Sequence, residues 1–161
     1  MKTYRRILVP IDSVSRGEAL LRRAAEIAQT EHAEVMVLKV IDTRSGFESD
    51  GPLGLLPMEQ AARKKPAERQ RLDLMLARSK LRWAESQVIC GEPAPVLADT
   101  IQQWRPDLIV IAAGLFLPGW VASAVARSGG VRPDVLTVAC GNPFSRLAQA
   151  VFPRVAHQAP Q

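Results

Sequence analysis

The chain has 161 residues, of which 47% are hydrophobic and 23% charged, and its net charge is +5. These values are typical of one soluble globular domain whose core needs neither metals nor disulfides to fold. No apolar run approaches the ~20 residues of a membrane-spanning helix, and the N-terminal residues lack a signal-peptide pattern. We therefore expect a cytoplasmic protein with no membrane partner. Cys90 and Cys140 have no metal-ligand spacing, and we expect both to be reduced.

The positive charge favours weak association with nucleic acids. The basic residues are scattered, however, and the densest group falls on a helix that we expect to face solvent. That group contains Arg63, Lys64, Lys65, Arg69 and Arg71. We predict no nucleic-acid partner. A nucleic-acid-associated protein is a third interpretation, and it would require the arginines to gather on one face.

The first quarter of the chain has the pattern of a strand, a helix and a second strand. Residues 5–12 predict a strand that is mostly β-branched and apolar, with Pro10 near its end. Asp12 offers N-cap chemistry to a helix whose apolar residues repeat to about residue 30. Residues 35–41 predict a second buried strand. This spacing predicts a right-handed parallel βαβ unit.

The next segments predict a long loop, an interrupted helix and a strand near a sheet edge. Residues 42–57 contain three glycines and two prolines, a composition typical of a loop. A helical pattern covers 58–82, and Pro66 predicts a break that divides it into two pieces. Residues 83–90 predict a third strand, which is less apolar than the first two, as expected nearer an edge.

Residues 91–93 turn the chain into a third helix, which Pro106 ends. The run that follows, over 108–112, is short and entirely apolar. Such a run predicts a strand buried on both faces, in the middle of a parallel sheet. Ligands of open α/β sheets bind beyond the carboxyl ends of the strands, so we expect a site after this strand.

The last part of the domain predicts a helix over 120–128, a glycine cap at 129–130 and a fifth strand over 135–139. The complete pattern is that of a doubly wound α/β domain over residues 1–140. Residues 141–161 would form a C-terminal extension, with one short amphipathic helix and then a disordered tail.

Three segments together resemble the universal stress protein family: residues 7–12 (ILVPID), 90–94 (CGEPA) and 106–114 (PDLIVIAAG). Their order and spacing cover nearly the whole chain to about residue 140. The resemblance implies an open five-stranded parallel sheet in the order 3-2-1-4-5, with helices on both faces. It implies a ligand crevice between the first and fourth strands. It also implies a homodimer, which in this family often forms through the fifth strand.

Many members of that family bind ATP or AMP through the pattern G-x2-G-x9-G-(S/T) after the fourth strand. The glycines let backbone N–H groups approach the phosphates, and the last hydroxyl lies at a helix N-terminus. Counted from Gly114, the pattern fails, because its next two glycine positions are Leu117 and Arg127. A better alignment places Gly119 at the start of the last helix. Most of the loop is then missing, and Trp120 replaces the hydroxyl.

The resemblance implies five candidate nucleotide-binding residues: Asp12, Val40, Gly91, Gly114 and Gly119. Asp12 matches an acidic residue that lies beside the ribose or metal in nucleotide-binding members, although an N-cap role also explains it. Val40 matches a position near the adenine, but a valine that ends a buried strand needs no ligand to explain it. Turn geometry also accounts for Gly91.

From this pattern we predict a non-catalytic regulatory module of the stress response, of the type that does not bind ATP and has no cofactor. No pairing of histidine, cysteine or carboxylate residues indicates catalysis. The alternative is an ATP or AMP sensor, with Mg²⁺, that keeps weak affinity through the helix dipole behind Gly119. Leu115, Phe116 and Trp120 either form an apolar contact surface for a partner or fold inward and fill the nucleotide space.

Overall fold

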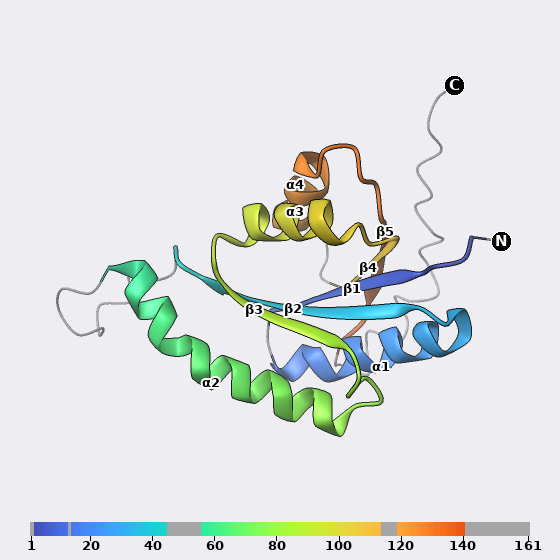
Figure 1. Ribbon diagram of the computed structural model, residues 1–161, viewed down its shortest axis with the longest axis horizontal. Helices are drawn as coiled ribbons and strands as arrows, with labels where there is room; N and C mark the ends of the chain where they lie inside the picture. The colour runs from blue at the N-terminus through green and yellow to red at the C-terminus, as the bar shows by residue number, and fades with distance from the viewer. Residues whose placement is uncertain (1, 13, 45–55, 114–118, 141–161) are drawn as a thin grey trace.

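The computed structural model describes residues 2–12, 14–44, 56–113 and 119–140. They form a five-stranded parallel sheet with two helices on each face (Figure 1). The elements along the chain are β1 (Arg6–Ile11), α1 (Val14–Glu31), β2 (Glu34–Asp42), α2 (Pro57–Arg78), β3 (Glu85–Gly91), α3 (Pro93–Trp104), β4 (Leu108–Ala112), α4 (Gly119–Arg127) and β5 (Asp134–Val138). Among the described residues, no helix is both long enough and apolar enough to cross a membrane.

The strand order is β3-β2-β1-β4-β5, and every neighbouring pair is parallel, as predicted. The chain moves outward from β1 to β3 and then returns to place β4 on the other side of β1. The connection after β1 therefore leads toward β2, and the connection after β4 leads toward β5, at the other edge of the sheet. In open α/β sheets, ligands bind in a crevice beyond the carboxyl ends of two such strands, so this is where we look for a site.

The central strands divide their side chains between two apolar clusters. Ile7 and Val9 of β1 belong to the cluster beneath α1 and α2, whereas Leu8 belongs to the cluster beneath α3 and α4. In β4, Val110 and Ile109 follow the same alternation. All five side chains are fully buried. Burial on both faces explains why the sequence runs of these strands lack polar residues.

The predicted break at Pro66 is wrong, because α2 is one continuous helix from Pro57 to Arg78. Pro66 lacks the N–H that an internal helix position normally donates. Buried side chains nevertheless anchor the helix on both sides of the proline: Ala61 before it and Leu72 after it. This packing holds both halves of α2 on the same face of the sheet and outweighs the local cost.

Several smaller predictions are confirmed, with adjusted bounds. β3 is an edge strand, but it begins at Glu85, so the exposed Trp83 precedes it. Gly129 and Gly130 follow α4 with φ values of +64° and +90°, the left-handed conformation expected of a glycine cap. Both cysteines are free. The predicted helix and tail within residues 141–161 lie outside the described residues.

Two carboxylates tie together the amino ends of the strands. Asp107, just before β4, accepts the backbone N–H groups of Arg5 and Arg6 at 2.8 and 3.0 Å. Asp134, at the start of β5, accepts the Tyr4 hydroxyl at 2.9 Å and pairs with Lys2 at 2.9 Å. Burial opposes ionisation of Asp134, but these two hydrogen bonds prevail and hold its pKa below the ordinary value.

Candidate functional site

A small charged group surrounds Asp12 at the carboxyl ends of β1 and β2. Lys39 Nζ donates a hydrogen bond to the backbone oxygen of Asp12 at 2.6 Å. Arg16 Nη1 lies 3.3 Å from Asp12 Oδ2, and both side chains are about half exposed. An exposed pair of this kind stabilises the fold by at most ~1 kcal/mol. Its main consequence is that the Asp12 carboxylate already has a cationic partner from its own chain.

The two cations beside Asp12 were not among the predicted site residues. Arg16 follows Asp12 by four residues, the spacing at which side chains meet across one helical turn. Lys39 is a single charged residue inside the otherwise apolar run of β2. Both signals are present in the sequence. α1 begins at Val14, two residues after Asp12.

Cys140 lies after β5, within electrostatic reach of the same charged pair. Burial raises the pKa of the Cys140 thiol above its ordinary value, Arg16 lowers it and Asp12 raises it. The thiol Sγ contacts the carbonyl oxygen of Val138 at 3.3 Å. A thiol with a raised pKa is a poor nucleophile. Within the described ranges, no three histidine, cysteine or acidic residues come together as a metal site.

Two of the predicted residues lie on the α3 and α4 side of the sheet. Val40, near the end of β2, and Trp120, the second residue of α4, are both partly buried. Both pack against the same core cluster, which includes Leu8 and the α4 residues Val121 and Ala124. Trp120 thus lies in the first turn of α4 and packs its side chain against the domain.

The three candidate glycines have different surroundings. A Cβ atom at Gly91 would lie 2.8 Å from Val96 Cγ2, so close packing of β3 against α3 explains this glycine. Gly91 also ends an edge strand, which β2 separates from β1. Among the described residues, no atom lies within 4 Å of a Cβ atom built at Gly119. Gly114 lies outside the described residues, as do Leu115 and Phe116.

The model of the universal stress protein family matches residues 3–129. The solved structure of the hypothetical protein MJ0577 has a TM-score of 0.64 and 18% identity, covering 88% of this chain and 99% of that chain. Universal stress protein UspA from Lactobacillus plantarum has a TM-score of 0.56 and 24% identity, covering 86% and 99%. A universal stress protein family protein from Arabidopsis thaliana with AMP bound has a TM-score of 0.57 and 14% identity, covering 88% and 95%.

A search of curated proteins gave no significant match. At identities below 25%, the solved structures establish the fold, and they agree with the observed five-stranded sheet. The family model spans most of the chain, including the strands that form the crevice. The chain therefore belongs to the universal stress protein family.

Proposed function

We propose that this chain is a non-catalytic regulatory module of the stress response that acts in the cytoplasm and does not hold ATP in its crevice. The observation that carries this proposal is the position of Trp120. It lies in the first turn of α4 and packs against the same apolar cluster as Val40. An indole offers one N–H donor and a large apolar surface, whereas a phosphate site requires several convergent donors.

The polar side of the crevice supports the same proposal. The Asp12 carboxylate is paired with Arg16, and the Lys39 ammonium donates to the Asp12 backbone. A ligand that used the Asp12 carboxylate would have to compete with the Arg16 partner. The raised pKa of the nearby Cys140 thiol also disfavours covalent catalysis at this position.

Thermal melting in the presence of ATP and Mg²⁺ tests this proposal. A ligand at a hundredfold excess over its Kd stabilises the native state by about 2.7 kcal/mol. For a chain of this size, that gain would raise the melting temperature by roughly 5–10 °C. We expect no shift at millimolar ATP with Mg²⁺. A saturable shift that disappears in Asp12→Ala would contradict the proposal and show that the shortened turn still holds phosphate.

The second candidate function is an ATP or AMP sensor. It is favoured by Gly119, because no described residue lies within 4 Å of a Cβ atom built there and a helix N-terminus attracts anions. The Arabidopsis protein with AMP bound supports it at the level of the family. Melting with AMP in place of ATP separates the two candidates, because a shorter phosphate chain requires fewer donors from the missing loop.

We also propose that the protein forms a homodimer through β5. This strand lies at a sheet edge, and its exposure alternates along its length. Leu136 and Val138 pack against the core, whereas Val135 and Thr137 are exposed. An edge strand with unpaired backbone groups is a template for pairing with another strand. A second copy of the chain would cover this edge.

The variant Val135→Lys tests the dimer. A lysine on the exposed face of an edge strand disfavours pairing with a second strand. In sedimentation analysis, we expect a dimer for the wild type and a monomer for Val135→Lys at the same concentration. The matched control is Leu74→Lys, an exposed position on α2. If the wild type sediments as a monomer, the proposed homodimer is wrong. If Val135→Lys sediments as a dimer, the dimer does not form through β5.

A further inference from the structure

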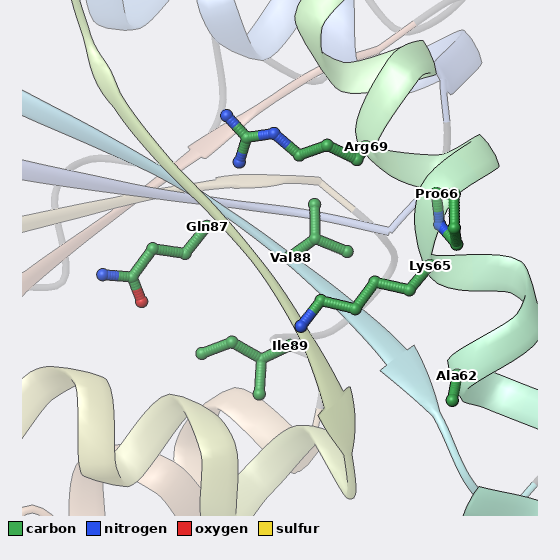
Figure 2. A pocket seen from close by; sticks show the side chains of 7 residues that line it. All are labelled: Ala62, Lys65, Pro66, Arg69, Gln87, Val88 and Ile89. Atoms are coloured by element: carbon green, nitrogen blue, oxygen red, sulfur yellow. The ribbon is translucent and has the colours of Figure 1, made fainter. Parts of the chain in front are cut away.

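A groove runs along the open edge of β3, beside α2 (Figure 2). Its volume is about 570 Å³. Ligand sites commonly span ~300–1,000 Å³. Four residues of α2 line it, together with three consecutive residues of β3, at positions 87–89. Because the strand residues are consecutive, the groove follows the backbone of the edge strand as well as its side chains.

The backbone of β3 directs the polar groups of alternate residues toward this groove, and Arg69 already occupies one of them. Arg69 Nη1 donates to the carbonyl oxygen of Ser86 at 3.0 Å, so that carbonyl faces away from β2. In a parallel strand, alternate residues direct their backbone groups to the same side. Val88 therefore presents its N–H and C=O to the open edge. Gly91 has the opposite parity, and its oxygen accepts the N–H of Thr43 on the β2 side at 3.2 Å.

The side of the groove formed by α2 is positively charged. Arg69 also donates to Ser86 Oγ at 2.9 Å and pairs with Asp73 at 3.1 Å, so its charge is already engaged. Lys65 is exposed, and its side chain extends from α2 toward β3 in Figure 2. Over the described ranges, Lys65 forms no ion pair. α2 as a whole has six basic and three acidic residues.

We propose that this groove binds an extended acidic peptide segment of a partner protein, which adds as a strand to the free edge of β3. The backbone groups of Val88 would supply main-chain hydrogen bonds, and the Lys65 ammonium would select a carboxylate side chain of the peptide. The half-buried Ile89 and the exposed Ala62 give apolar contact on either side of Lys65. β3 lies two strands away from β1. This groove is therefore separate from the candidate nucleotide site, and the proposal holds whether or not the chain binds nucleotide.

Fluorescence anisotropy with the full chain tests the proposal. The probe is a labelled peptide of about eight residues that alternates glutamate and valine, comparable in length to a strand. We expect saturable binding that weakens about tenfold in Lys65→Glu and also weakens in Lys65→Gln. The matched control is Lys64→Glu, the neighbouring exposed lysine outside the groove, which should bind like the wild type.

A second probe needs no protein variant. The same peptide, N-methylated at every residue, has no main-chain N–H donor on either edge, cannot complete the strand hydrogen bonds and should not bind. If the methylated peptide binds as tightly as the unmethylated one, the peptide does not add as a strand. If Lys65→Glu and Lys64→Glu lose the same affinity for the peptide, the groove is not the binding site. Absence of binding at millimolar peptide would overturn the proposal altogether. Two competition results would also overturn the proposal. In the first, an unlabelled peptide of lysine and valine displaces the probe as well as the unlabelled acidic peptide does. In the second, an oligonucleotide displaces it more strongly, which would indicate a general polyanion surface.

Discussion

Replacing Leu8 with alanine is expected to lower the free energy of unfolding by about 2–5 kcal/mol, the range for a large aliphatic side chain removed from a packed core. Leu8 is fully buried in the central strand β1, where Ile109 of β4 and Met36 of β2 are its partners in register. Truncation leaves a cavity between these strands and the helices α3 and α4. Chemical denaturation of the variant and the wild type measures the loss.

The matched control for Leu8 is Leu74→Ala, which removes the same atoms from a position that is 51% exposed on α2. We expect this change to stay within about 0.5 kcal/mol of the wild type, as surface substitutions usually do. Comparable losses at both positions would contradict the assignment of β1 to the centre of the core.

Replacing Trp120 with serine is expected to destabilise the protein by about 2 kcal/mol, less than the ~3–5 kcal/mol of a fully buried tryptophan. The side chain is partly buried and packs against the cluster beneath α3 and α4. Its removal opens the first turn of α4 and exposes apolar surface of that cluster. Denaturation monitored by circular dichroism, which does not depend on the lost fluorophore, measures the effect.

Trp83→Ser is the matched control, because Trp83 is 56% exposed and precedes β3. We expect little change in stability for this variant. If Trp120→Ser kept full stability but abolished the dimer or a partner complex, Trp120 would act as a contact surface. Loss of stability with assembly retained supports the proposal that Trp120 fills the crevice.

Much of the fold follows from the pattern of apolar residues in the sequence. The runs at 7–9 and 108–112 are apolar throughout because their strands are covered on both faces. The strand order came from the family resemblance, since the apolar pattern of a strand does not specify its neighbours. The predicted break in α2 was wrong, because the rule that proline interrupts a helix considers only the local backbone. It does not include the packing of Ala61 and Leu72 on either side of Pro66.

The candidate site was less accessible to sequence reasoning. Asp12 was correctly placed at the end of the first strand, but its partners were missed. Lys39 interrupts an apolar strand because its long side chain reaches from β2 to the Asp12 carbonyl, a contact that needs the strand register to be known. The groove at β3 depends on the angle between α2 and the sheet edge, which no spacing of residues encodes.

Equilibrium dialysis of the purified chain against millimolar ATP with Mg²⁺ tests the central claim most directly, since it counts bound nucleotide without relying on stability or fluorescence. We expect a ratio of bound nucleotide to chain close to zero, because the Trp120 indole packs against the core in the first turn of α4. A ratio near one nucleotide per chain, reduced in Asp12→Ala, would show that the crevice between β1 and β4 still binds nucleotide and would contradict the account.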